Sequence, residues 1–326
     1  MRAVYYERNG TARDVLRLAE VETPQPGPGE VRVRLAASGV NPSDVKSRAG
    51  VTRKIAFPRV IPHSDGAGEI ECVGEGVSPS RVGERVWVWN GQWRRPFGTA
   101  AESIVLPSGQ AVPLPANTSM EVGACLGIPA YTAYQAVELD GVKAGVRVLV
   151  AGGAGAVGHY AIQFAKKRKA SVITTVSSPV KAEIARRAGA DHVIDYRREH
   201  VGERVMEFTG KAGVDVVIEV DLAANARLLP SVIAPTGWSQ STAAARPRRP
   251  SRSSTCCRTA STSNFFWFTR CRYSCARRRP PRSRACSNAE NSCTTWRRPS
   301  LSPTSRRRTR PSSREKAMGN VVVNLA

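Results

Sequence analysis

The clearest chemical signal in this chain of 326 residues is a turn rich in glycine. Gly153, Gly155 and Gly158 stand at the spacing G-x-G-x-x-G, after the apolar run 146–151 and at the start of an amphipathic stretch. In such a strand–turn–helix unit the first glycine permits a tight turn, the second admits a pyrophosphate, and the third allows close helix packing. Free N–H groups and the helix dipole then hold the phosphates. We therefore expect a dinucleotide to bind along Gly153, Ala154, Gly155, Ala156, Val157 and Gly158.

The choice of dinucleotide depends on the residues that follow the second strand-like run, 170–176. A protein that binds NAD usually places Asp or Glu there, to accept a hydrogen bond from the ribose 2′-hydroxyl group. This chain instead has Ser177, Ser178 and Lys181. Hydroxyl groups and a lysine attract a 2′-phosphate that a carboxylate would repel. The sequence therefore predicts NADPH as the cofactor.

The elements around this turn alternate between strand and helix. Apolar runs of strand type lie at 146–151, 170–176, 191–195 and 213–220, and helical patterns lie at 158–168, 179–188 and 199–209. This alternation predicts an α/β fold with a parallel, doubly wound sheet. Residues 1–120 differ, because their short Val-rich runs are separated by Gly and Pro turns, which indicates a β-rich domain. From Ser119 a helix is expected on both sides of Pro129.

The formal net charge of +23 is unevenly distributed. Residues 237–326 hold 20 of the 49 Lys and Arg residues but only 2 of the 26 Asp and Glu residues. Six of the eight cysteines lie there as well. We therefore divide the chain into a β-rich domain at 1–120, a truncated dinucleotide-binding domain at 121–236, an aberrant basic segment at 237–316 that we expect to be disordered, and a terminal strand of the first domain at 317–326.

Three interpretations of segment 237–316 are open. It could be a disordered basic arm for nucleic acid, because arginine clusters attract phosphates. It could be a zinc module, although its cysteine spacings match no common zinc motif. The third interpretation, which we favour, is a shift of the reading frame that a second shift later reverses. Translation of GC-rich DNA in the wrong frame yields a segment rich in Arg, Pro, Ser, Thr and Cys, as this one is. The pattern fails abruptly after Gly237 and returns at Ala317.

Composition also bears on the compartment. Outside that segment the only cysteines are Cys72 and Cys125, which do not form a disulfide framework. No apolar run reaches the roughly 18 residues of a membrane span, and no signal peptide is evident. We expect a cytoplasmic protein with no membrane partner.

Several motifs of the N-terminal part occur in a characteristic order. They are ASGVNPSDVKSRAG (37–50), VIPHSDGAGEIECVGEGV (60–77), VGERVWVW (82–89), GTAAES (98–103) and LGIPAYTAYQAV (126–137), followed by the glycine turn. In this order the chain resembles the medium-chain dehydrogenases/reductases, and among them the zinc-independent quinone oxidoreductases related to zeta-crystallin. The resemblance covers 1–236 and 317–326. It implies a GroES-like catalytic domain, a Rossmann domain and a homodimer.

The resemblance also argues against a metal. Zinc alcohol dehydrogenases of this superfamily place their zinc ligands at positions that fall by motif on Asn41, Ser64 and Ile128, none of which is a good zinc ligand. His63 and Cys125 lie nearby, but we interpret them as a loop histidine and a core cysteine. We therefore expect a metal-free enzyme.

By the same resemblance, Asn41 and Thr132 would face the nicotinamide end of the site, and Tyr196 would lie near the 2′-phosphate. Asp44 could serve as an acid or base. Each has a plainer alternative: Asn41 and Asp44 as capping residues, Thr132 bonded to its own helix, and Tyr196 as packing at a strand end. Many relatives carry tyrosine where this chain has Lys46, so a tyrosine contact to the substrate is lost.

Three functions remain open from the sequence. The first is NADPH-dependent reduction of quinones, acceptors that take a hydride without a Lewis acid. The second is reduction of an enone or alkenal. The third is a non-catalytic protein that binds NADPH or RNA, or an inactive frameshifted product.

Overall fold

The computed structural model describes residues 1–139, 141–241, 255–263, 266–273 and 320–325. For residue 236 and for residues 238–241, 255–263 and 266–273 it describes the backbone only. The rest of segment 237–316 lies outside the described residues, so the expectation that it is disordered stays a prediction.

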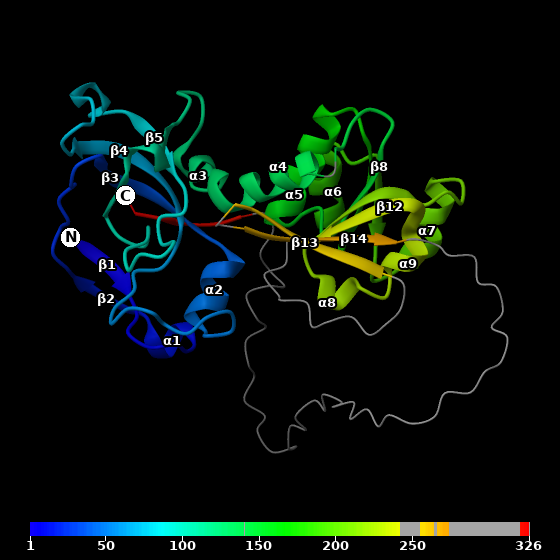
Figure 1. Cartoon of the computed structure of the whole chain (residues 1–326), viewed down its shortest axis with the longest axis horizontal. Helices are drawn as coiled ribbons and strands as arrows, with labels where there is room; N and C mark the ends of the chain where they lie inside the picture. The colour runs from blue at the N-terminus through cyan, green and yellow to red at the C-terminus, as the bar shows by residue number, and fades with distance from the viewer. Residues whose placement is uncertain (140, 242–254, 264–265, 274–319, 326) are drawn as a thin grey trace, which may run out of the picture. The chain divides into compact units, whose positions relative to one another are not determined.

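The first domain is built on an antiparallel sheet (Figure 1). The strand β3 (Glu30–Val40) pairs with β4 (Asp65–Val73), β6 (Ser103–Pro107) and β15 (Val321–Asn324), and β4 continues to β5 (Arg85–Val88) and β7 (Ala111–Pro113). Along β3, Val31, Val33 and Leu35 are buried while the side chains between them face outward, as the period of two in a strand requires. The strand β15 pairs antiparallel with β3, so residues Val321–Asn324 lie in this sheet.

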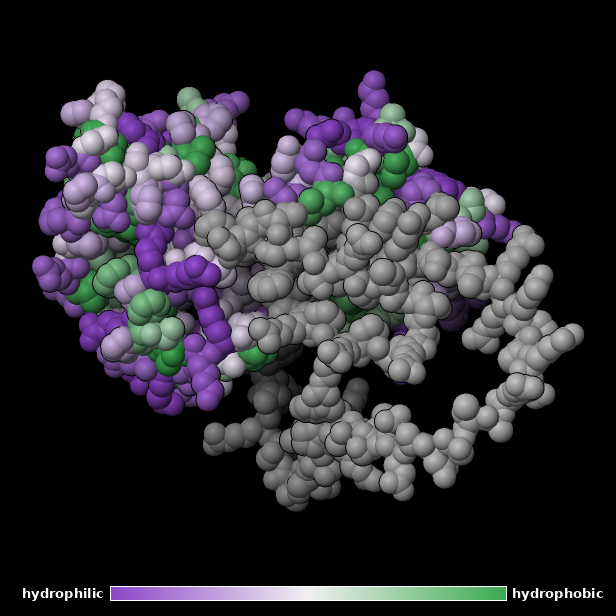
Figure 2. Space-filling view, viewed as in Figure 1, coloured by the Kyte–Doolittle hydropathy of each residue, from purple (hydrophilic) through white to green (hydrophobic). Residues whose placement is uncertain are grey.

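Short elements close this domain around the sheet. They are β1 (Arg2–Tyr5), α1 (Ala12–Val15), β2 (Arg17–Glu20), α2 (Pro42–Arg48), η1 (Pro79–Arg81) and η2 (Ser108–Gln110). The strands β1 and β2 form a separate antiparallel pair. On the face shown in Figure 2, hydrophilic residues cover much of the described surface and hydrophobic ones are scattered among them. The large apolar side chains are instead concentrated in the interior, including Ile61, Ile70, Ile104 and Leu106.

Three helical pieces connect this domain to the parallel sheet: α3 (Met120–Gly123), η3 (Leu126–Ala130) and α4 (Tyr131–Leu139). Ser119 caps α3, since its side chain accepts a hydrogen bond from Val122 N at 3.4 Å. The segment η3 is a π-helix that contains Pro129, which has no N–H group to donate. The predicted helix on both sides of Pro129 is therefore confirmed, with a π-turn at the proline.

The second domain contains the parallel sheet. Its elements are β8 (Arg147–Val150), α5 (Ala156–Lys167), β9 (Ser171–Val176), α6 (Pro179–Arg187), β10 (His192–Asp195), α7 (Val201–Phe208), β11 (Val214–Glu219), α8 (Leu222–Asn225), α9 (Leu229–Val232) and β12 (Ile233–Ser241). The strand order β10-β9-β8-β11-β12 is that of a doubly wound sheet, as predicted. Val148, Leu149 and Val150 of β8 are almost fully buried, because a central parallel strand is covered on both faces.

Two further strands extend this sheet within the basic segment. The strand β14 (Phe266–Tyr273) pairs antiparallel with β12, and β13 (Thr255–Ser263) pairs antiparallel with β14. None of the strands predicted from the sequence lies in this region. The difference arises because an antiparallel pair at a sheet edge is held by backbone hydrogen bonds, which any side chain except proline allows.

Candidate functional site

The glycine turn lies between β8 and α5, at the carboxyl end of the parallel strand. Gly152 has φ of +67°, so this residue, which precedes the motif, adopts the left-handed conformation of the turn. A Cβ atom on Gly153 would lie 2.2 Å from Thr174 Oγ1, and one on Gly158 would lie 2.3 Å from Gly152 O. Gly153 lies within the turn at 151–154, as expected, and packs against β9, while Gly152 is the residue of the turn with positive φ.

Gly155 has a different environment from the other glycines of the motif. A Cβ atom there would meet only Gly152 O, at 3.1 Å, and otherwise open space. Gly155 is also the N-cap of α5, and the first bond to its carbonyl comes from His159 N at 2.9 Å. The N–H groups of residues 156–158 therefore have no acceptor within the helix and point out of its N-terminal end. This arrangement fits an anion at the helix N-terminus.

The residues expected to select the cofactor lie together. Lys181 Nζ donates to Ser177 Oγ at 3.0 Å, and Tyr196 N donates to Val176 O at 3.1 Å, directly before Ser177. Ser178 caps α6, accepting from Lys181 N at 3.4 Å. Tyr196 is 52% exposed, so about half of its surface is accessible to a ligand. We call Ser177, Lys181 and Tyr196 the hydroxyl–lysine cluster.

In the first domain, Asn41 lies between two carboxyl groups. Its backbone N–H donates to Asp44 Oδ2 at 2.8 Å, and its side-chain Nδ2 donates to Asp65 Oδ2 at 2.7 Å. All three residues are buried: Asn41 is 3% exposed, Asp44 9% and Asp65 0%. We call them the carboxyl cluster. The predicted capping positions of Asn41 and Asp44 at the start of α2 are present, and the contact with Asp65 is additional.

Burial governs the charge of this cluster. Desolvation raises the pKa of Asp44 to about 7, against the lowering effects of the hydrogen bonds from Asn41 and of the nearby Arg53 guanidinium. Desolvation, and then the proximity of Asp44, raise the pKa of Asp65 to about 8, against the hydrogen bonds from Ile128 and Asn41. Two buried carboxyl groups in one cluster do not readily carry two negative charges. At neutral pH the cluster therefore holds at least one proton.

Thr132 lies on α4, directly after the π-turn. It is buried, and its Oγ1 has no hydrogen-bond partner among the described residues. The alternative in which this hydroxyl group bonds to its own helix is therefore not what the structure shows. A buried hydroxyl group without a partner suits a site that a ligand completes.

The residues near the motif positions of the zinc ligands make other contacts. His63 has φ of +75°, and its Nδ1 lies 3.0 Å from Ser38 Oγ. Burial lowers the pKa of His63 to about 4. Cys125 Sγ donates to Glu121 O at 3.2 Å, and burial raises the pKa of its thiol to about 11. No group of three His, Cys, Asp or Glu side chains suited to a metal occurs among the described residues. Zinc independence stays a prediction.

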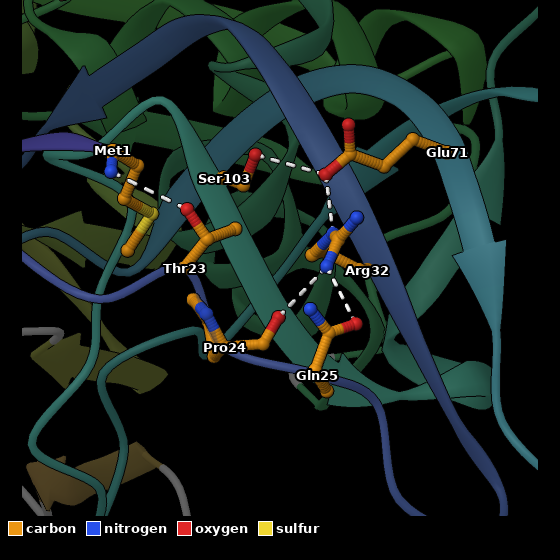
Figure 3. A network of polar contacts seen from close by, with 7 residues as sticks. All are labelled: Met1, Thr23, Pro24, Gln25, Arg32, Glu71 and Ser103. Carbon is orange, nitrogen blue, oxygen red and sulfur yellow. Dashed lines mark hydrogen bonds and ion pairs between the residues drawn. The ribbon is translucent and has the colours of Figure 1, made fainter.

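A groove of the described surface lies elsewhere, on the sheet of the first domain. It has a volume of about 540 Å³. Figure 3 shows the polar network along it: Arg32 Nε donates to Glu71 Oε1 at 2.5 Å, and Ser103 Oγ donates to the same oxygen at 3.1 Å. Arg32 also donates to Gln25 Oε1 at 2.8 Å. These charges compensate each other within the fold, and none of the predicted site residues lines the groove.

The main residue that the sequence interpretation missed is Asp65. Its position in the motif PHSDGAGE was recognised, but no role was assigned to it. The available signal was a carboxyl residue at the start of a strand-like run, followed directly by the small residues Gly66, Ala67 and Gly68. Such a carboxyl group must be paired or neutral when buried. Its partners, however, are 24 and 63 residues away along the chain.

A β-rich domain followed by a parallel sheet with this glycine turn defines a two-domain dehydrogenase fold. Two domain families match the chain: the alcohol dehydrogenase GroES-like domain over residues 27–116, and the zinc-binding dehydrogenase domain over residues 156–244. The second description concerns that domain family and does not show that this chain binds zinc. Among the helices of the described residues, none is long and apolar enough to cross a bilayer.

Three individual proteins illustrate the likeness. A quinone oxidoreductase of Pseudomonas aeruginosa is 37% identical over 207 residues, 63% of this chain and 62% of that protein. A 2-haloacrylate reductase of Burkholderia sp. is 34% identical over 224 residues, 67% of this chain and 66% of that protein. A solved mycobacterial protein in complex with NADPH is 32% identical, with a TM-score of 0.66, covering 73% of this chain and 72% of that one.

The chain therefore belongs to the quinone oxidoreductase family of the medium-chain dehydrogenase/reductase superfamily. It matches less than two thirds of the length of the two curated relatives, 62% and 66%.

Proposed function

We propose that this chain is an NADPH-dependent oxidoreductase that reduces a quinone by hydride transfer. The observation that supports this most directly is the pairing of an open glycine turn with a buried, proton-holding carboxyl cluster. The first fits a dinucleotide, and the second fits an acceptor whose oxygen must gain a proton.

The cofactor site is supported by residues on the parallel sheet. Gly155 leaves the space in which a pyrophosphate can approach, and the N–H groups of 156–158 can donate to it. Ser177, Lys181 and Tyr196 would hold the 2′-phosphate, the first two through the hydroxyl and ammonium groups that already contact each other. When bound, NADPH supplies the hydride.

The acceptor side is assigned to Asn41, Thr132 and Asp44. The amide of Asn41 and the hydroxyl group of Thr132 would orient the acceptor carbonyl, because Thr132 Oγ1 is buried without a partner of its own. Reduction of a quinone to a hydroquinone takes up one hydride and one proton. Asp44, with a pKa of about 7, would hold that proton and pass it to the acceptor oxygen, after which solvent restores it.

The test compares two acceptors in the same NADPH oxidation assay. A para-quinone should be reduced with a higher kcat/KM than an α,β-unsaturated aldehyde, and an Asn41→Ala variant should lower kcat for the quinone. NADPH binding without turnover of either acceptor would instead identify a non-catalytic protein.

A second candidate, reduction of an activated alkene, is favoured by the likeness to the 2-haloacrylate reductase. The same cluster could protonate an enolate after hydride addition. A 2-haloacrylate and a quinone should be assayed side by side, and the larger kcat/KM decides between the two functions.

The basic segment 237–316 bears on whether the chain as written is active. We propose that it results from two compensating frameshifts, because the chain pattern fails after Gly237 and returns at Ala317. Reading the DNA across codons 230–320 in all three frames tests this directly. The chain as written and the chain with the frame restored should then be compared for protease resistance and NADPH oxidation. We expect the restored chain to be the more resistant and active, and to form a homodimer.

A further inference from the structure

Asp65 joins two parts of the chain that carry the proposed acceptor site. It is the first residue of β4 and is fully buried. Its Oδ2 accepts two hydrogen bonds, one from Asn41 Nδ2 at 2.7 Å and one from Ile128 N at 2.8 Å. Its own carbonyl oxygen accepts from Thr99 Oγ1 at 2.6 Å. One carboxyl oxygen thus connects the residue before α2 with the π-turn η3.

The π-turn is shaped to receive this carboxyl group. A Cβ atom on Gly127 would lie 2.1 Å from Asp65 Oδ1 and 2.6 Å from Asp65 Cγ, so the carboxyl group packs directly on the backbone at Gly127. The residue before η3, Cys125, makes no side-chain cap. Asp65 supplies, from a distant strand, the acceptor that the start of this turn otherwise lacks.

The contact also determines how Asn41 is oriented. Only the NH₂ end of an amide can donate, so an acceptor at Asp65 Oδ2 fixes which way the Asn41 side chain is turned. Asp65 Oδ1 has no hydrogen-bond partner among the described residues. One carboxyl oxygen therefore makes the polar contacts, and the other packs against Gly127.

We propose that Asp65 is a positioning residue, whose carboxyl oxygen fixes the Asn41 amide and the π-turn that leads to Thr132 in one arrangement. The consequence for catalysis rests on the function proposed above. Asp65 does not touch the acceptor; it acts through Asn41 and through the backbone of η3. Misplacement of a reacting contact by about 1 Å can lower a rate on the order of 100-fold.

The test uses substitutions that separate the hydrogen-bonding oxygen, Oδ2, from the rest of the Asp65 carboxyl group. Asp65→Asn keeps an oxygen where Oδ2 lies and places its NH₂ group at the position of Oδ1, so kcat should stay within about threefold. Asp65→Ala removes the acceptor, and kcat should fall by roughly 10- to 100-fold while the Kd for NADPH is unchanged. Gly127→Ala should displace the carboxyl group and lower kcat similarly, with the double variant no worse than either single one.

A readout independent of turnover completes the test. Amide hydrogen exchange of the peptide covering 124–130 should accelerate in Asp65→Ala and Gly127→Ala, and should match the wild type in Asp65→Asn. Thr99→Val is the matched control, since it removes the contacts of Thr99 Oγ1 with the Asp65 carbonyl and with Ser38 Oγ but leaves the Asn41 and Ile128 contacts of Asp65 in place.

The possible outcomes distinguish the two proposals. If Asp65→Ala retains wild-type kcat and wild-type exchange at 124–130, the positioning role is wrong. The role is also wrong if kcat and NADPH affinity fall together in Asp65→Asn. If exchange responds as expected but the wild type reduces no acceptor, the positioning role stands and the proposed function fails.

Discussion

The two halves of the proposed site handle charge in opposite ways. The hydroxyl–lysine cluster is partly exposed, with Tyr196 52% exposed and Ser177 and Lys181 half-buried, whereas Asn41, Asp44 and Asp65 of the carboxyl cluster are at most 9% exposed. In water a lysine keeps its charge at little cost, which suits recognition of a phosphate. In the interior a carboxyl group holds its proton instead, which suits proton transfer to an acceptor. Exposure and residue type together therefore suit the two clusters to different proposed roles.

The largest effect that would test this comparison comes from the glycine turn. Gly158→Ala should lower the melting temperature of the ligand-free protein, because the new Cβ would lie 2.3 Å from Gly152 O. Overpacking of this kind costs about 1–3 kcal/mol, and NADPH binding should fall with it. Differential scanning fluorimetry and NADPH titration measure the two effects.

Gly155→Ala is the matched control for that substitution. Its Cβ would meet only Gly152 O, at 3.1 Å rather than 2.3 Å, so the ligand-free melting temperature should fall much less than in Gly158→Ala, while NADPH affinity falls by on the order of tenfold. An equal drop in stability in both variants, or a drop in neither, would contradict the separate roles assigned to these two glycines.

Prediction from sequence succeeded where the interacting residues are close along the chain. The glycine turn, the Ser119 cap and the Ser177–Lys181 pair all depend on residues within about one turn of helix, so spacing alone located them. Asp65 was missed because its partners, Asn41 and Ile128, are distant along the chain, and no local sequence pattern indicates that they lie close to it. The positive φ of Gly152 was not predicted, since both Gly152 and Gly153 are sterically permissive and only the backbone conformation distinguishes them.

The cofactor half of the comparison can be tested at Lys181. Lys181→Ala should weaken NADPH by about 1–3 kcal/mol, the range for a hydrogen bond to a charged group, and should leave NADH almost unchanged. Lys181→Arg, which keeps the positive charge, should recover most of the affinity. Kd values for both cofactors, measured by fluorescence titration, give the answer, and equal losses for NADPH and NADH would remove Lys181 from the phosphate site.

The buried half can be tested through pH. The pKa of Asp65 is about 8 in the folded protein and near 3.8 when unfolded, so the unfolded chain loses this proton at lower pH. Above pH 4 the unfolded state binds fewer protons at this site, and the free energy of unfolding therefore falls as pH rises towards 8. Asp44 acts in the same direction, with its pKa raised to about 7.

Asp65→Asn should remove the larger part of this pH dependence. Melting temperatures between pH 5 and 8.5 should fall less steeply in the variant than in the wild type, and the two curves should separate most above pH 7. Parallel curves would mean that Asp65 is ionised in the folded protein, and the contrast between the two clusters would then fail.

The smallest expected effect is that of metal removal. A zinc ion next to the acceptor would stabilise the negative charge that develops on the acceptor oxygen. In the function proposed here, a proton held by the carboxyl cluster takes that role. The motif positions of the zinc ligands carry Asn41, Ser64 and Ile128. In the structure, Asn41 and Ile128 donate hydrogen bonds to Asp65 through N–H groups, which cannot bind a cation. We therefore expect turnover to be unchanged within error after treatment with a chelator. Purified protein should contain well under one zinc per chain by elemental analysis. About one zinc per chain, removable with loss of activity, would show that the acceptor side uses a Lewis acid and that the protonated carboxyl groups have another purpose.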